Sequence, residues 1–471
     1  MTQVSSTGQG RHRLNLVNAL KNRYALAVIV LLMTATAGLI WGTGASAVAS
    51  KTPSAPPALP AALDDSTPWR LLMPGMSSAP APLGKTPDSQ AEALLFAIYD
   101  QMRQGRREAA LAQASRLVTL YPHFQLGQLV YADLLNIGLS RPLDVSGLAA
   151  ADAGLAKEEG SGAVRLDKLL QESRQRLKGM EPAAPAGWQP RNFAALAPEQ
   201  PYALAVDTSK SRLYWFANKG AASPGGVPRL ELIMDTYVSV GREGVGKQAE
   251  SDSRTPTGVY FIGKNLSDTK LPDIYGAGAL TMNYPNALDL MRGKTGSGIW
   301  LHGTVSHQYS GPPQNSNGCV VLSNSDLKKL LALESIRGTP VVIAEKLEWA
   351  PSEKIGATGQ SFSATLEKWQ QAQHHDPANS LPPFYSARFQ RDGKDLSHWW
   401  PDILSRATPG KRAPALQMLS MMHWVDQEEH MIVTLGSPEA GSQEKKARLR
   451  LYWAKEGGTW KIVYQGPVAA A

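Results

Sequence analysis

Apolar residues are spaced differently in successive parts of the 471-residue chain. Residues 24–42 are an unbroken apolar and small-residue stretch, whereas apolar positions recur at helical spacing in the region 89–180. Short alternating runs follow within 202–345, separated by Ser, Lys and Gly-Pro turns, which predicts β-strands. Over 361–466 the pattern is first helical and then strand-like, which predicts an α+β unit. The chain is therefore predicted to be multidomain.

The first 50 residues predict a signal peptide or a membrane anchor. Basic side chains precede the apolar stretch without any acidic residue, at Arg11, Arg13, Lys21 and Arg23. The apolar stretch 24–42 is long for a signal-peptide core and just adequate for a spanning helix, which needs about 20 residues. Ala45-Ser46-Ala47 and Ala47-Val48-Ala49 both fit a cleavage site, so cleavage and retention remain open. In either case the positive charge predicts that residues 51–471 lie outside the cytoplasm.

A linker and a helical region come next. Residues 51–88 contain nine prolines with Ser, Ala and Gly, which is the composition of an extended linker. In the helical region 89–180, Gly105 and Tyr121-Pro122 separate successive helices, and the first two resemble one tetratricopeptide-type (TPR-like) hairpin. Such hairpins need stacking to bury their faces. The region is therefore either a small α-helical bundle that packs on the next domain or a docking surface. A second Pro-rich joint is expected at 182–201.

The stretch 202–345 predicts a mostly-β domain with one clear helix. Its strand-like runs are 202–207, 212–216, 230–234, 236–240, 258–262, 299–301 and 341–344. Residues 323–333 predict the helix, because Ser323 or Asn324 can cap its start. Cys319 lies just before this helix.

Composition and charge limit the classes of function that are expected for this chain. A hydrophobic content of 43% and a charged content of 19% describe a globular chain. The formal charge of +8 is spread along the chain without a run of five Lys or Arg, so nucleic-acid binding is not expected. Cys319 is the single cysteine, which excludes an intramolecular disulfide, and a thiolate metal cluster is not expected. It is therefore either a small buried apolar residue or a nucleophile.

Cys319 and His302 have the neighbours that a thiol nucleophile and its base require. His302 follows a strand-like run, and Gly303 leaves its own carbonyl accessible to fix the imidazole tautomer. Asn317-Gly318 predicts a tight turn before the cysteine, with N–H groups around Gly318 facing a developing oxyanion. The start of the following helix is expected to favour the thiolate.

These residues resemble the motifs of the YkuD-type L,D-transpeptidase catalytic domain. That family carries a His-Gly pair, a later Ser-x-Gly-Cys element and an upstream Thr-Pro-x-Gly turn. This chain has His302-Gly303, Ser316-Asn317-Gly318-Cys319 and Thr255-Pro256-Thr257-Gly258, with the cysteine seventeen positions after the histidine. The resemblance spans 202–345 and implies a periplasmic enzyme, secreted or anchored to the inner membrane, that acts on peptidoglycan stem peptides.

The resemblance also implies roles for the residues. Cys319 would attack the carbonyl between an L-centre diamino acid and D-alanine, and His302, oriented by the Gly303 carbonyl, would act as base and then acid. The acyl-enzyme would meet an amine of a second stem peptide or a lipoprotein (L,D-transpeptidase), or water (L,D-carboxypeptidase). Neither a metal nor an organic cofactor is implied. Oxyanion or substrate contacts would come from Ser316, Asn317 and Gly318.

Two positions depart from the commonest form of the family. Asn317 stands where His is usual, and Val321 stands where Arg is usual. The Ser-Asn-Gly-Cys form is more similar to the branch of helical-cell-shape L,D-carboxypeptidases, which also carry a C-terminal NTF2-like domain. Residues 361–466 resemble such an α+β domain in element order and in their Trp- and Tyr-rich layout. This branch implies a part in cell wall biogenesis, remodelling and cell shape, while the two departures leave a non-catalytic envelope scaffold open.

Two further groups of side chains have both a binding and a structural interpretation. Aromatic side chains of the C-terminal region either line an open cone that binds sugar or peptide, or belong to the core: Tyr385, Trp399 and Trp400. Cationic side chains near Thr255 either pair with substrate carboxylates or are solvated loop charges: Arg242, Lys247 and Arg254.

Overall fold

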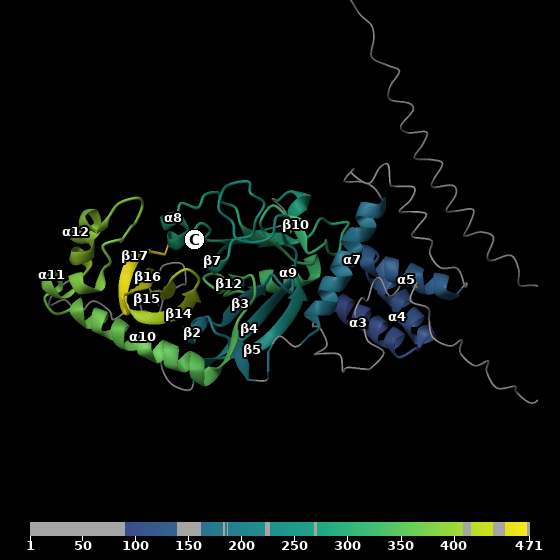
Figure 1. Ribbon diagram of the computed structural model, residues 1–471, viewed down its shortest axis with the longest axis horizontal. Helices are drawn as coiled ribbons and strands as arrows, with labels where there is room; N and C mark the ends of the chain where they lie inside the picture. The colour runs from purple at the N-terminus through teal and green to yellow at the C-terminus, as the bar shows by residue number, and fades with distance from the viewer. Residues whose placement is uncertain are drawn as a thin grey trace, which may run out of the picture. The chain divides into compact units, whose positions relative to one another are not determined.

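The computed structural model describes most of the chain after residue 89 (Figure 1). The described residues are 90–138, 162–181, 184–185, 187–221, 227–267, 271–407, 416–436 and 448–468. The signal peptide or anchor predicted at 1–50 and the linker predicted at 51–88 lie outside them. None of the described helices is long and apolar enough to cross a bilayer.

Four helices of the described residues precede the first strand. They are α3 (Gln90–Arg103), α4 (Arg107–Leu120), α5 (Gln125–Gly138) and α7 (Gly162–Gly179), which we call the helical region. Apolar side chains at helical spacing form a core of their own, in which Leu95, Leu117 and Leu126 are fully buried. Helices are therefore present where the spacing of apolar residues predicted them.

An eight-stranded mixed sheet, which we call the catalytic sheet, forms the domain that carries His302 and Cys319 (Figure 1). We call this domain the catalytic domain. Its strands, in chain order, are β3 (Tyr202–Asp207), β4 (Arg212–Ala221), β5 (Pro228–Tyr237), β7 (Gly258–Ser267), β8 (Gly278–Met282), β9 (Trp300–His302), β11 (Val320–Val321) and β12 (Pro340–Ala344). The order across the sheet is β11-β9-β8-β7-β12-β3-β4-β5, with β11–β9 and β12–β3 parallel. The mostly-β prediction for this stretch is confirmed.

Alternate residues of these strands enter two different apolar cores, as the two-residue period of a strand requires. In β3, Leu204 and Val206 lie in a core that includes buried leucines of α9 (Asn324–Leu331). Their neighbours Ala203 and Ala205 lie in the core on the other side of the sheet. Both faces of the catalytic sheet are therefore covered.

A second, antiparallel sheet covers the face away from α9. Its order is β17-β16-β15-β14-β2. The strands are β2 (Phe193–Leu196), β14 (Gln417–Val425), β15 (Glu429–Gly436), β16 (Arg448–Glu456) and β17 (Thr459–Pro467). Phe216 and Val259 of the first sheet share one apolar core with Met422 and Tyr452 of the second. The two sheets are thus joined by a common core rather than by a linker.

The segment expected to be a Pro-rich joint, 182–201, contributes strands to this assembly. β2 pairs with β14, with Ala195 opposite Met421. β1 (Trp188–Pro190) pairs with β13 (Trp349–Pro351). The expectation of a joint is wrong for these residues, because their backbone groups complete sheets whose other strands lie far along the sequence.

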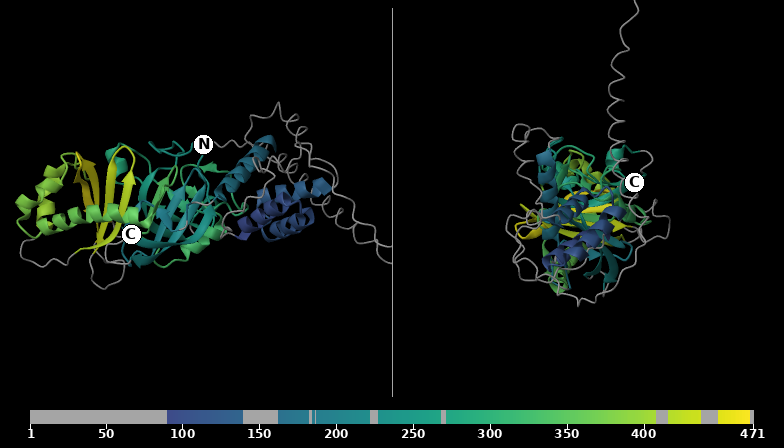
Figure 2. Two further views of the ribbon diagram at one scale, coloured as in Figure 1. Left: turned by 60° about the horizontal axis from the view of Figure 1, so that its bottom comes forward. Right: turned by 90° about the vertical axis from the view of Figure 1, so that its right-hand side faces the viewer.

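Helices cover the outer face of the second sheet, and α10 runs along it in both views (Figures 1 and 2). They are α10 (Ser352–Ala372), α11 (Pro377–Ser380), the 3-10 turn η3 (Pro382–Phe384) and α12 (Leu396–Arg406). Phe362 and Trp369 of α10 are buried against the sheet, in a core that also contains Tyr385. Trp399 and Trp400 pack against the same core. Tyr385 is therefore a core residue, Trp399 and Trp400 are partly buried at the edge of the core, and the NTF2-like identity of 361–466 stays a prediction.

Candidate active site

His302 and Cys319 are carried by neighbouring parallel strands at one edge of the catalytic sheet. β11 pairs with β9 so that Val320 lies opposite Leu301 and Val321 lies opposite His302. Leu301 and Val320 are fully buried in the core with α9. Because side chains alternate along a strand, His302 and the cysteine immediately before Val320 project from the opposite face. The fold therefore places the imidazole and the thiol on one face, one strand apart.

The His302 ring is fixed by its own following residue. Its Nδ1 lies 2.7 Å from the Gly303 carbonyl oxygen. A carbonyl can only accept, so Nδ1 carries the proton and donates it, which leaves Nε2 with a free lone pair. The side chain is buried, and this burial lowers the pKa of His302 below 6.5, opposed by the bond to Gly303. The imidazole is therefore neutral at neutral pH and able to accept a proton.

Close packing explains the glycine after the histidine. A Cβ at Gly303 would overlap Oδ1 of Asn324, the first residue of α9. That Oδ1 accepts the Ala277 N–H at 2.8 Å, and the Asn324 amide donates to the Thr304 carbonyl at 2.9 Å. Asn324 thus ties three segments together directly behind the His302-Gly303 pair.

Tyr275 is a neighbour of the imidazole that sequence reasoning missed. It ends η2 (Asp273–Tyr275), and its ring centroid lies 5.2 Å from that of His302 and 5.0 Å from that of Trp300. Its carbonyl accepts the Gly303 N–H at 3.0 Å. No local pattern in the sequence indicates this contact, because η2 and β9 are separated by more than twenty residues.

The Cys319 thiol is half-buried and uncharged at rest. Its Sγ donates to the Gly298 carbonyl at 3.4 Å, and no described hydrogen bond joins it to His302. Burial raises the pKa of Cys319 above 9.0, while a hydrogen bond from the Trp300 backbone and the charge of Lys247 oppose that rise. α9 begins only after β11, so the cysteine does not lie at a helix start. The expectation of a thiolate favoured by the helix is therefore wrong.

Two hydroxyl groups hold the turn before Cys319. Ser316 Oγ donates to the Cys319 carbonyl at 2.7 Å and accepts the Gly318 N–H at 3.1 Å. Thr255 Oγ1, which is fully buried, donates to the Gly318 carbonyl at 2.9 Å. Gly318 has φ 121°, and a Cβ there would lie 2.6 Å from the Arg254 carbonyl oxygen. Only glycine fits this position without displacing the backbone.

The residues predicted to contact the oxyanion or the substrate are hydrogen-bonded to other residues of the protein. The Gly318 N–H would have to leave Ser316 to bind an oxyanion. Asn317 is exposed, and its Oδ1 accepts a hydrogen bond from Arg242. Ser316 itself ends β10 (Gln314–Ser316), which pairs in parallel with β6 (Val240–Gly241). A role for these residues toward substrate stays a prediction.

The three cationic candidates differ in their surroundings. Lys247 is buried and forms an ion pair with Asp252 at 2.7 Å, so its charge is already matched. Arg254 is bonded to a backbone carbonyl at 3.0 Å, whereas Arg242 is exposed beside Asn317. Among the described residues, no three His, Cys, Asp or Glu side chains are grouped as a metal site.

The geometry can be compared with known families. Residues 201–343 match the family model YkuD, the L,D-transpeptidase catalytic domain. These residues are an L,D-transpeptidase catalytic domain. The domain includes His302, Cys319 and Thr255, and the match excludes both the helical region and the strands β14–β17. No curated protein matches the chain.

Solved structures that are similar to the chain include an L,D-transpeptidase and a helical cell shape determining protein. Bd1075 of Bdellovibrio bacteriovorus is 24% identical over 60% of this chain and 98% of its own, with a TM-score of 0.47. The helical cell shape determining protein Pgp2 of Campylobacter jejuni is 22% identical over 56% of this chain and 91% of its own, with a TM-score of 0.43. An L,D-transpeptidase of Mycobacterium smegmatis is 14% identical over 31% and 58%, with a TM-score of 0.19.

Proposed function

We propose that this chain opens the bond between the L-centre diamino acid and D-alanine of peptidoglycan stem peptides, through an acyl-enzyme on Cys319. One observation carries the proposal within the L,D-transpeptidase domain. His302, with Nδ1 held by the Gly303 carbonyl, lies one strand from Cys319 and on the same face of the sheet. A thiol and a base of fixed tautomer in this arrangement suit nucleophilic acyl transfer.

Because Cys319 and His302 are both neutral before the reaction, the thiol proton would move to the imidazole while the sulfur attacks the substrate. Cys319 would release the Gly298 carbonyl and pass its proton to His302 Nε2 as sulfur bonds to the substrate carbonyl carbon. The carbonyl electrons move to oxygen, and they return as the bond to the D-alanine nitrogen breaks. His302 then gives the same proton to the leaving amine, which balances the step. The thioester remains on Cys319.

The acceptor of the acyl group distinguishes two activities. An amine of a second stem peptide or a lipoprotein gives an L,D-transpeptidase, and water gives an L,D-carboxypeptidase that trims tetrapeptides to tripeptides. The second activity is the alternative to the first, and the Ser-Asn-Gly-Cys form, which resembles that of the carboxypeptidase branch, supports it. In either case we place the enzyme outside the cytoplasm, with its polymer substrate, in wall biogenesis, remodelling and cell shape.

Muropeptide analysis tests the proposal. The full chain is incubated with purified sacculi, and the digested products are identified by mass spectrometry. Wild type is expected to remove D-alanine from tetrapeptides or to form L,D cross-links, which differ in mass, and Cys319→Ala is expected to do neither. Identical muropeptide patterns for wild type and Cys319→Ala, with equal thermal unfolding, would sink the enzymatic proposal and favour the envelope scaffold.

A further inference from the structure

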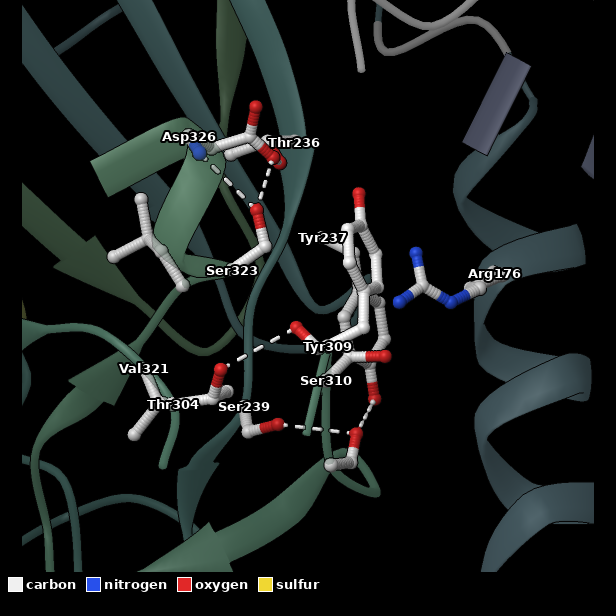
Figure 3. A pocket seen from close by; sticks show the side chains of 12 residues that line it. Arg176, Thr236, Tyr237, Ser239, Thr304, Tyr309, Ser310, Val321, Ser323 and Asp326 are labelled. Carbon is white, nitrogen blue, oxygen red and sulfur yellow. Dashed lines mark hydrogen bonds between the residues drawn. The ribbon is translucent and has the colours of Figure 1, made fainter. Parts of the chain in front are cut away.

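The loop 303–313 joins the two catalytic candidates. The chain leaves His302 at its beginning and returns from its end through β10 to Cys319. Figure 3 shows Tyr309 and Ser310 of this loop lying between the strands of the catalytic domain and α7, which carries Arg176. The position of this loop therefore depends on the helical region as well as on the catalytic sheet.

A buried carboxylate of α7 binds the loop. Ser310 Oγ donates to Glu172 Oε1 at 2.6 Å. Glu172 is 2% exposed, and the same oxygen accepts from Arg176 Nε at 2.9 Å and Nη2 at 2.8 Å. Arg176 is in turn paired with the buried Glu92 of α3 at 2.7 Å. The loop hydroxyl is thus bonded to a carboxylate that Arg176 of the same helix holds in place and links to Glu92 of α3.

Aromatic contacts hold Tyr309, the residue before Ser310. The Tyr309 ring lies 4.6 Å from that of Phe124 and 5.5 Å from that of Tyr121, at the junction of α4 and α5. The Tyr309 N–H also donates to the His123 carbonyl at 3.1 Å. Two consecutive loop residues, 309 and 310, are therefore attached to different helices of the helical region.

The catalytic domain holds the inner side of the same loop. The Gly311 carbonyl accepts from Tyr237 OH at 3.0 Å and from Ser239 Oγ at 3.2 Å. The Arg176 guanidinium stacks over the Tyr237 ring, 3.9 Å from its centroid. A polar cavity of about 10 Å³, the size of a single water, remains between these groups. The loop is therefore packed between two layers, with little free space around it.

We propose that Glu172 is a positioning residue: through Ser310 it fixes the loop 303–313, and so sets the place of the Gly303 carbonyl relative to the Cys319 turn. This inference rests on the proposed function, because it assigns both ends of the loop to the reaction. Neither Glu172 nor Ser310 has a described contact with the thiol or the imidazole, so they act through the backbone. A small misplacement of reacting groups slows chemistry more than it weakens substrate binding.

Ser310→Ala is the test, because it removes the bond to Glu172 and leaves the buried ion pairs intact. In the full chain we expect kcat to fall about tenfold with KM nearly unchanged, which is the lower end for one lost hydrogen bond to a charged group. Hydrogen exchange of residues 303–313 should become faster. Ser306→Ala is the matched control, since its exposed hydroxyl bonds to none of the described residues. Ser310→Thr, which keeps the hydroxyl, should restore kcat.

The outcomes separate the inference from the proposed function. If Ser310→Ala and Ser306→Ala have equal kcat and equal exchange in 303–313, the loop does not depend on Glu172 and the inference is wrong. A lower unfolding temperature with unchanged kcat, assayed well below that temperature, would also overturn it. If wild type neither releases D-alanine nor forms cross-links, the proposed function fails. The exchange comparison then still decides whether the helical region holds the loop.

Discussion

At the scale of single residues, burial moves the pKa values of the two catalytic candidates apart. The pKa of His302 lies below its ordinary 6.5 because its ring is shielded from water. The pKa of Cys319 lies above 9.0 for the same reason, in spite of the Trp300 backbone and the Lys247 charge. Between these limits both groups are uncharged. The reactive ion pair therefore has to form during attack on the substrate rather than before it.

This neutral pair predicts a broad pH optimum. As pH falls through the pKa of His302, the imidazole gains a proton and can no longer accept one from Cys319, so kcat/KM should fall only below pH 6.5. As pH rises through the pKa of Cys319, the proton needed by the leaving amine is lost, so the alkaline limb should lie above pH 9.0. A pH profile of kcat/KM checks both limbs.

Thiol labelling gives an independent check on the same prediction. The rate of Cys319 alkylation by iodoacetamide should keep rising beyond pH 9.0, because the thiolate is the reactive form. A labelling rate that is already constant around neutral pH would contradict it, and would indicate a preformed thiolate–imidazolium pair.

The sequence predicted the catalytic candidates but not all of the residues that hold them in place. His302-Gly303 and Ser316–Cys319 are recognisable because the chemistry needs those residue types at fixed local spacing. Tyr275 contacts His302, and Glu172 contacts the loop 303–313, from elements distant in the chain, and no periodicity indicates either contact. The expectation that Cys319 lies at a helix start was wrong because the two residues of β11 follow the cysteine before the helix α9 begins.

At the scale of elements, the strands β3, β4, β7 and β12 of the catalytic sheet are covered on both faces. α9 covers one side, and the sheet β17-β16-β15-β14-β2 covers the other, with Phe193 and Phe216 in their common core. Their rings are 6.3 Å apart, although they belong to different sheets. Removing the second sheet would therefore expose a contiguous apolar surface, which promotes aggregation.

A truncation tests this coupling of elements. The fragment 202–345, which matches the expected limits of the catalytic domain, should be insoluble or molten, because Ala205, Tyr214 and Val259 lose their partners. The fragment 90–468 keeps both sheets and is the control. Soluble yield, size-exclusion elution and near-ultraviolet circular dichroism measure the difference. A monodisperse, cooperatively unfolding 202–345 fragment would show that the shared core is dispensable.

The elements that sequence reasoning missed lack the local pattern on which it depends. β3 is a six-residue run, apolar from Tyr202 to Val206, and was predicted with its observed limits. β2 is only four residues long, and its partner β14 lies more than two hundred residues later. α10 begins at Ser352, before the expected start of the C-terminal region at 361, although its first half contains Gly356 and Gly359. Burial of Ile355 and Phe362 outweighs the poor helix propensity of those glycines.

At the scale of the whole molecule, one carboxylate connects the helical region to the catalytic domain. Glu92 of α3 is 1% exposed and is bonded to Arg176 of α7 and to Arg212 of β4. The two guanidinium groups share this partner, and each has a second carboxylate, Glu172 or Asp235. Glu92 is the carboxylate that both guanidinium groups share, so removing it breaks two buried ion pairs at once.

Glu92→Gln should accordingly loosen the attachment of the helical region. We expect the free energy of unfolding to fall by about 3 kcal/mol, as for a broken buried pair. Limited proteolysis should also cut between the helical region and the catalytic domain sooner than in wild type. Glu108→Gln on the exposed surface of α4 is the matched control and should change neither measurement. Equal denaturation midpoints for the two variants would refute the role given to Glu92.

The burial of these charges has a consequence for the response to ionic strength. Mobile ions screen charges that water reaches, such as the exposed Lys219–Glu231 pair at 3.1 Å, and weaken them as salt rises. Arg176 and Arg212 are only 2% and 1% exposed, and their partners Glu92 and Glu172 are buried as well, so ions cannot approach. The helical region should hold the loop 303–313 equally firmly in dilute and in concentrated salt.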